Sequence, residues 1–185
     1  MDVTLLGYVL LGLLRQAPAT GYDLRKLFAT SPLMTFSDSP GAIYPALRKL
    51  ERQGLIRGQV EQGSGLRLRR VFQLTPAGLR ELRRWLTLPV TRDEVVRKQD
   101  RLLARFAFMD DAAGRADSVR LLQEIEREAA AYLPELRDYL ERNEPGMPLS
   151  GRLALDGGVR SHEALLEWSR AALAAYGQAG KDDTP

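Results

Sequence analysis

The side chains in this sequence with the clearest chemical use are basic, and they gather in two short segments of the N-terminal half. Guanidinium and ammonium groups bind phosphate oxygens, and an arginine can also donate two hydrogen bonds to the O6 and N7 edge of guanine. These segments therefore favour recognition of a polyanion, DNA in particular, over catalysis. The residues are Arg48, Lys49 and Arg52 within 39–54, and Arg67, Arg69 and Arg70 just after Gly63-Ser64-Gly65.

The residue types that most catalytic and metal sites need are scarce. The chain has no cysteine and one histidine, His162, which excludes disulfides and argues against thiolate and multi-histidine metal sites. We find no nucleophile beside a base and no Walker motif, and Gly157-Gly158 follows no predicted strand. We therefore expect no enzyme activity, no catalytic residue, no metal and no cofactor.

The charge of the chain is divided unevenly between its halves. Residues 1–90 hold 13 Lys and Arg against 6 Asp and Glu, a net charge of +7, whereas residues 91–185 hold 14 against 18, a net charge of −4. Together these give the overall +3. A basic first half joined to an acidic second half indicates that the first half faces a polyanion, although ordinary surface variation is the alternative reading.

The apolar N-terminal run Val3–Leu14 raises the question of a membrane or export signal. A signal peptide carries basic residues before its apolar stretch, whereas Asp2 precedes this one. The run is also shorter than the ~20 apolar residues that span a bilayer. We expect a cytoplasmic protein with no membrane partner.

The spacing of apolar residues in the first 88 positions predicts three helices, a hairpin and a fourth helix. Thr20, Ser39 and Thr75 suit helix N-caps, and Gly54 suits a left-handed C-cap. This order is typical of a winged helix-turn-helix, which lays its third helix in the DNA major groove. The expected elements are helices over 3–15, 21–29 and 39–54, hairpin arms over 55–62 and 66–74, and a helix from Pro76 that ends before Pro89.

The third predicted helix has two distinct faces. Ile43, Leu47 and Leu50 share the core face, and Tyr44 lies between the two faces. Small residues at the helix start allow close approach to a groove floor, and its free amides suit a phosphate. For a single helix, a solvated basic face would be the plainer reading. The face opposite the core carries Gly41, Ala42, Pro45, Arg48, Lys49 and Arg52.

The second arm of the predicted hairpin carries the arginines of the wing. Arg67 and Arg69 lie two residues apart and so share a face. Arginines beside a glycine turn suit the DNA backbone or the negative potential of a minor groove. They could instead protect an edge strand from aggregation. The combination of wing and reader helix favours DNA binding.

The C-terminal half is predicted to be helical and to need a second chain. We expect helices over 94–109, from an Asp117 cap to about 142 with a kink at Pro134, and over 153–176. Their apolar residues occupy more than one face, which indicates a homodimer. The fold class is thus mainly α with a small β-hairpin. The expected domains are a DNA-binding domain over 1–88, a helical dimerisation and effector domain over 89–178, and a disordered tail over 179–185.

Several motifs resemble the PadR family of transcription regulators, in the order and spacing of that family. The match covers about residues 4–88, and a weaker likeness to the longer PadR subclass continues in 101–109 and 161–168. The matching segments are Gly21-Tyr22-Asp23-Leu24, the run from Ser39 through Tyr44-Pro45-Ala46-Leu47 to Glu51, Gly54-Leu55, Gly63 to Arg70, and Leu74-Thr75-Pro76-Ala77-Gly78.

The resemblance implies a dimeric repressor on a palindromic DNA operator, with a small apolar or aromatic effector that modulates its affinity. A winged-helix protein-interaction module without DNA binding is the alternative, and an enzyme with a helical active site is a more distant one. The predicted DNA-contacting residues are Tyr22, Ser39, Gly41, Ala42, Tyr44, Pro45, Arg48, Lys49, Arg67, Arg69 and Arg70.

Overall fold

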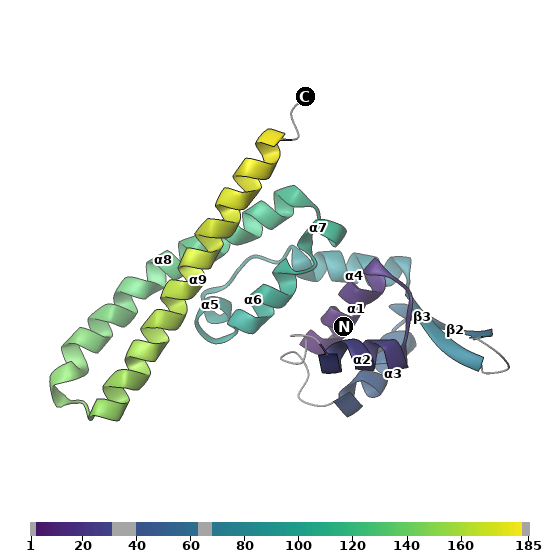
Figure 1. Ribbon diagram of the computed structural model, residues 1–185, viewed down its shortest axis with the longest axis horizontal. Helices are drawn as coiled ribbons and strands as arrows, with labels where there is room; N and C mark the ends of the chain where they lie inside the picture. Colours follow the sequence, from purple (N-terminus) through teal and green to yellow (C-terminus); the bar gives the residue numbers. More distant parts are fainter. Residues whose placement is uncertain (1–2, 31–39, 63–67, 183–185) are drawn as a thin grey trace. The chain divides into compact units, whose positions relative to one another are not determined.

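The computed structural model describes residues 3–30, 40–62 and 68–182 (Figure 1). The chain divides into two compact units. Unit 1 contains Met1–Leu88 together with Leu103–Gly114, and unit 2 contains Pro89–Leu102 together with Arg115–Pro185. A short later segment of the chain thus belongs to the same unit as the N-terminal half.

Unit 1 combines four helices of the N-terminal half with a small antiparallel sheet, as the sequence pattern predicts. The sheet has three strands in the order β1-β3-β2, so the two-stranded hairpin predicted from the sequence lacks one strand. That strand, β1, is only two residues long and pairs Ala19 with Phe72, and so short a segment has no periodicity to reveal it. In chain order the elements are α1 (Leu5–Gln16), β1 (Ala19–Thr20), α2 (Gly21–Thr30), the 3₁₀ turn η2 (Pro40–Ala42), α3 (Ile43–Arg52), β2 (Ile56–Gln62), β3 (Leu68–Leu74) and α4 (Pro76–Leu86).

The end of α3 is locked by a glycine turn. Gly54 has a φ of +70°, the left-handed conformation predicted for this position and one that glycine adopts at little cost. Its amide donates to the Glu51 carbonyl at 2.9 Å, and the Leu55 amide donates to the Leu50 carbonyl at 3.0 Å. These two bonds form a Schellman motif, which ends the helix and turns the chain into β2.

The start of α4 is built onto this same turn. Thr75 is the N-cap, since its Oγ1 accepts from the Gly78 amide at 3.0 Å. The Thr75 hydroxyl also donates toward the Gly54 carbonyl at 2.7 Å, and its amide donates to the Leu55 carbonyl at 3.1 Å. A Cβ at Gly78 would lie under 3.0 Å from the Leu55 carbonyl oxygen. The end of α3, the start of β2 and the start of α4 therefore meet at one backbone junction.

The core of unit 1 centres on two stacked aromatic rings. Trp85 of α4 is fully buried and stacks on Tyr8 of α1 with ring centroids 4.4 Å apart. The Glu81 carboxylate accepts hydrogen bonds from Arg84 and, at 2.8 Å, from the Tyr8 hydroxyl. These bonds, chiefly the one from Arg84, keep the pKa of Glu81 below its usual value. Trp85 is thus a core residue.

A buried arginine from the later segment closes the other end of α4. Arg105 is 1 % exposed, and its guanidinium donates to the carbonyls of Leu86 and Leu88. A cation at a helix C-terminus is favoured by the helix dipole and satisfies carbonyls that lack partners within the helix. Phe108 also packs against Gly12, where a Cβ would lie 2.5 Å from the ring. These contacts explain why 103–114 belongs to unit 1.

Unit 2 is built around two long helices, α8 and α9, which pack side by side (Figure 1). Val90 and Arg92 bond to α8 through Glu124 and Glu135. His162 of α9 is buried, and the centroid of its ring lies 4.9 Å from that of the Tyr132 ring of α8. The remaining elements of the chain are α5 (Arg92–Arg97), α6 (Gln99–Phe106), which crosses the division between the units, α7 (Met109–Ala112), α8 (Arg115–Asn143), the 3₁₀ turn η3 (Glu144–Gly146) and α9 (Leu149–Asp182).

Several helix boundaries differ from those predicted by the sequence pattern. The single helix expected over 94–109 is wrong: Lys98 leaves the helical region, with φ −139° and ψ 44°, and separates α5 from α6. The helix that Asp117 was expected to cap begins at Arg115, after Gly114 at φ +96°, so Asp117 lies in its first turn. The helix continues through Pro134 to Asn143, and α9 begins four residues before and ends six residues after the predicted 153–176.

We predict that Gly78→Ala destabilises the protein by about 1–3 kcal/mol, the usual cost of overpacking a fitted site. The matched control is Gly157→Ala in α9, where the added Cβ meets no atom within 4 Å; it should raise stability by up to about 1 kcal/mol because alanine favours helix. Denaturant unfolding of both variants measures the difference. Equal stability of the two variants would contradict the tight junction at Leu55.

Candidate nucleic-acid interface

The second helix of the motif starts at a reciprocal cap. The Thr20 side chain accepts from the Asp23 amide at 3.1 Å, while the Asp23 carboxylate accepts from the Thr20 hydroxyl at 2.7 Å and from the Thr20 amide at 3.2 Å. These hydrogen bonds, chiefly the one from the hydroxyl, lower the pKa of Asp23. Because Thr20 also pairs with Val71 in the sheet, the cap fixes the start of α2 to β3.

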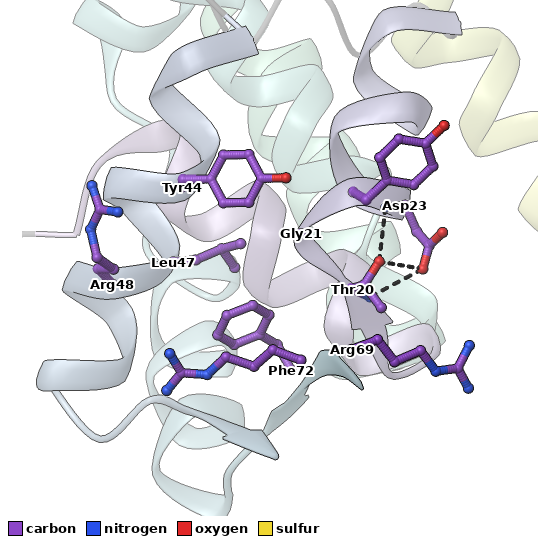
Figure 2. A pocket seen from close by; sticks show the side chains of 10 residues that line it. Thr20, Gly21, Asp23, Tyr44, Leu47, Arg48, Arg69 and Phe72 are labelled. Atoms are coloured by element: carbon purple, nitrogen blue, oxygen red, sulfur yellow. Dashed lines mark hydrogen bonds between the residues drawn. The ribbon is translucent and has the colours of Figure 1, made fainter. Parts of the chain in front are cut away.

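The third helix packs closely on the start of the second. Tyr44 of α3 lies over Gly21 of α2, where a Cβ would be 2.7 Å from the ring. The absence of a side chain at Gly21 therefore lets the tyrosine ring approach the backbone of α2 (Figure 2). Tyr44 remains 41 % exposed. This contact sets the spacing of the two helices and leaves part of the tyrosine ring accessible.

The two faces of α3 agree with the predicted pattern. Ile43, Leu47 and Leu50 are at most 2 % exposed and form the core face. Pro45, Arg48 and Arg52 are exposed, and Lys49 is half-buried. Since three of these four outer residues are cationic, α3 presents a positive, solvent-accessible surface along its length.

A broad open hollow of about 850 Å³ lies between α2, α3 and β3 (Figure 2). Its floor includes Leu47 and Phe72, and its rim carries both aromatic and basic side chains. Five of the predicted DNA-contacting residues line it together: Tyr22, Tyr44, Arg48, Arg69 and Arg70. Residues from three separate chain segments thus converge on one concave, cationic surface.

The strand register places the two described wing arginines on opposite faces of the hairpin. Arg69 pairs with Glu61 and Arg70 pairs with Val60, and neighbouring residues of a strand point to opposite faces. Arg69 reaches Glu61 at 3.8 Å with both side chains largely exposed, a geometry that stabilises little. The guanidinium of Arg69 is therefore available to a further anion.

Arg70 faces the third helix and is held there. Its Nη2 donates to both carboxylate oxygens of Glu51, at 2.8 and 2.9 Å, and its guanidinium lies 5.4 Å from the centre of the Phe72 ring. The Glu51 carboxylate also accepts from the Gly58 amide at 2.9 Å. One carboxylate therefore joins the end of α3 to both strands of the wing.

The other predicted contact residues that the structure describes do not line this hollow. Ser39 and Arg67 lie outside the described residues. Gly41 is exposed and Ala42 half-buried in η2, the turn that leads into α3. Pro45 and Lys49 lie on α3 but do not contribute to the hollow. The described members of the predicted set thus form one group of five around the hollow and a second group of four on α3 and η2.

Sequence reasoning predicted Thr20 as an N-cap but missed its partner Asp23, and it also missed Glu51 and Gly58. Thr20 and Asp23 stand at the spacing of a capping box, so a local signal for their reciprocal bonds existed. Glu51 and Gly58 carried no such signal, because Glu51 meets Arg70 across 19 positions of the chain. Pairing at that separation depends on strand register and on where α3 ends.

Among the described ranges 3–30, 40–62 and 68–182, no group of three His, Asp or Glu side chains is placed to hold a metal ion. Within those same ranges, no helix has the length and apolar character needed to cross a bilayer.

Two family models match this chain in adjacent segments. Residues 10–84 match the transcriptional regulator PadR-like family, and residues 99–176 match the C-terminal segment of virulence activator alpha. The first match includes α2, α3 and the wing, and the second covers most of α8 and α9.

The chain is also similar to characterised proteins over most of its length. It is 30 % identical over 138 residues to the negative transcriptional regulator PadR of Bacillus subtilis, covering 74 % of each chain. The solved structure of Bacillus subtilis PadR with operator DNA is 24 % identical and spans 95 % of this chain and 99 % of that one, with a TM-score of 0.46. The structure of the same protein with p-coumaric acid is 25 % identical over 93 % and 98 %, with a TM-score of 0.43.

Proposed function

The chain belongs to the PadR-like family of transcriptional regulators, and we propose that it is a dimeric repressor that binds a palindromic DNA operator and is released by a small-molecule effector. The single observation that carries the DNA-binding part is the convergence of Tyr22, Tyr44, Arg48 and Arg69 on the hollow between α2, α3 and β3. A repressing role is supported by the description of its Bacillus subtilis relative as a negative regulator.

The geometry of α3 suits the reader role in this proposal. Its N-terminal end is formed by small residues, Gly41 and Ala42, followed by the exposed Pro45, so the backbone is able to come close to a groove floor. Arg48, one turn further on, points outward from α3 (Figure 2) and has the reach to donate to guanine or phosphate. Lys49 and Arg52 follow as phosphate contacts on the same helix.

The wing supplies the second contact of the proposed complex. The exposed guanidinium of Arg69 lies on the face of β3 that also carries Val71, beside the cap of Thr20 and Asp23. From there it could bind a phosphate flanking the groove that α3 occupies. Tyr22 and Tyr44 would direct their exposed edges to the sugar–phosphate backbone between these two sites.

Residues 89–178 serve dimerisation in this proposal. Tyr139 of α8 and Leu149 and Leu153 of α9 are 50–61 % exposed, and a second copy of the chain would cover them. Two reader helices would then lie in successive major grooves, about 34 Å apart. An effector bound within the helical part would lower DNA affinity by favouring a different separation of the readers.

We expect Arg48→Ala to weaken binding to the region upstream of its own gene by roughly 10- to 100-fold, the worth of one base contact by an arginine. The control is Arg160→Ala, which removes the same charge from an exposed position of α9 and should leave affinity within about twofold. Fluorescence anisotropy over a salt series measures both. Unchanged binding by Arg48→Ala would remove α3 from the reader role, and the absence of any preference by the wild type would favour a protein-interaction module.

The mass in solution should be twice that of the 20.7 kDa chain, about 41 kDa. A double substitution Leu149→Glu/Leu153→Glu places two charges in the exposed apolar surface of α9 and should shift the protein toward monomer, because a buried unpaired carboxylate is costly. Light scattering on a sizing column reports the mass. A wild-type monomer at micromolar concentration would contradict the dimer.

p-Coumaric acid, which occupies one of the solved Bacillus subtilis PadR structures, is the first effector to test. We expect millimolar or lower concentrations to weaken binding of the upstream duplex without unfolding the protein. Cinnamic acid, which lacks only the phenolic hydroxyl, is the matched control for simple acidity and for the apolar ring. If DNA affinity stays the same across a panel of aromatic acids, the effector part of the proposal is wrong.

A further inference from the structure

Glu51 occupies a position where a carboxylate is electrostatically unfavourable. It lies in the last turn of α3 (Ile43–Arg52), where the partial negative charge of the helix end disfavours a carboxylate. It also contacts Arg70, one of the residues that line the hollow, and a negative charge there opposes the approach of DNA. A carboxylate that is unfavourable on both counts calls for a compensating role in the fold.

The contacts of Glu51 supply that role. Its carboxylate accepts two hydrogen bonds from Arg70 of β3 and one from the Gly58 amide of β2. Only 26 % of the Glu51 side chain is exposed, against 53 % of Arg70. Charged hydrogen bonds are stronger than neutral ones, and the Glu51 carboxylate is held by one guanidinium nitrogen from β3 and one backbone amide from β2, so this group of three constrains the position of the wing relative to α3.

The absence of a side chain at Gly58 allows the Glu51 carboxylate and the Arg70 guanidinium to pack against β2. A Cβ at this position would lie 2.8 Å from Glu51 Oε1, 2.5 Å from Arg70 Nε and 3.1 Å from the Phe72 ring. Any side chain at 58 would therefore push the pair away from β2. The site is fitted from three elements: the end of α3, the middle of β2 and the middle of β3.

Resting on the proposed DNA-binding function, we propose that Glu51 and Gly58 are positioning residues for DNA recognition and that Arg70 serves as their strut rather than as a phosphate contact. The carboxylate neutralises Arg70 and orients the wing, so that Arg69 on the opposite face of β3 and Arg48 on α3 reach the same duplex together. Glu51 itself touches no DNA.

The change in DNA affinity expected on removing Glu51 is opposite in sign to that expected from charge alone. Removal of a carboxylate from a DNA-binding surface should tighten binding, since one repulsive charge is gone. Glu51→Ala should instead weaken binding to the duplex upstream of its own gene by roughly 5- to 50-fold, the size of a lost coupled contact. Binding to a shuffled duplex of equal length and composition should stay the same or tighten.

The matched control is Glu61→Ala in the same wing. It removes the same charge, but among the described residues Glu61 makes only a 3.8 Å bridge to Arg69 between exposed side chains. We expect this variant to bind both duplexes as tightly as the wild type or up to about threefold more tightly. If Glu51→Ala behaves as Glu61→Ala does, the positioning role is refuted.

Two further variants separate the strut from a phosphate contact and from a change of charge. Arg70→Ala should leave the slope of log affinity against log salt close to that of the wild type, whereas loss of a phosphate contact would reduce it by about 0.9. Gly58→Ala changes no charge and should lower affinity for the upstream duplex as Glu51→Ala does. Gly177→Ala, with no atom within 4 Å of the added Cβ, is its control.

A measurement on the DNA-free protein distinguishes failure of this inference from failure of the proposed function. Amide hydrogen exchange at Gly58 should speed up in Glu51→Ala and Arg70→Ala and remain unchanged in Glu61→Ala. If the wild type shows no preference for the upstream duplex, the proposed function fails while the exchange data still judge the three-residue contact. Equal exchange in all variants would overturn the contact and the inference with it.

Discussion

The carbonyl of Leu55 is the point on which the arrangement of unit 1 depends. It accepts the Thr75 amide at 3.1 Å and the Thr75 hydroxyl at 3.0 Å, and it lies so close to Gly78 that no side chain fits there. A buried carbonyl needs partners, and these come from a segment about 20 residues away. The segment that leads from α3 into β2 and the start of α4 are thereby joined at one backbone atom.

Contacts next to this junction, together with contacts at the other edge of the sheet, shape the candidate interface. The Schellman turn at Gly54 ends α3 just after Glu51, which leaves that carboxylate opposite Gly58 and Arg70. At the other edge of the sheet, the cap formed by Thr20 and Asp23 joins the start of α2 to β3, and Gly21 admits the Tyr44 ring. The hollow between α2, α3 and β3 is therefore bounded on each side by a polar or steric constraint, and its shape does not depend on exposed side chains alone.

The acidic residues of this surface differ in what they cost and what they provide. Asp23 accepts the backbone amide of Thr20 and Glu51 accepts that of Gly58, whereas the contact of Glu61 within the described ranges is a long one with Arg69. Charge counting treats all three alike, as reductions of the +7 of the N-terminal half. Their contacts separate them, because a carboxylate that accepts backbone amides contributes to positioning in addition to its charge.

The sequence alone predicts the order of elements in the first half, because helix periodicity, the caps at Thr20 and Thr75 and a C-terminal glycine are all local signals. The third helix, expected over 39–54, begins instead at Ile43 after the 3₁₀ turn η2, with no side-chain cap at Ala42. The sequence also identifies the two faces of α3 and the family, since the motifs from Gly21 to Gly78 lie in fixed order. It fails at Lys98 and around Asp117, where caps and a left-handed glycine override a continuous apolar pattern. The two-residue strand β1 carries too few residues for any pattern.

Only the tertiary structure decides which charged residues are free and which are already engaged. Arg69 and Arg70 are neighbours and look equivalent as a sequence, yet the antiparallel register places them on opposite faces and gives one of them to Glu51. The same holds for Arg105, which the sequence presents as one more surface cation and the fold buries against the carbonyls of α4. Such pairings join residues about 20 positions apart, and their energies depend on distances that no local pattern contains.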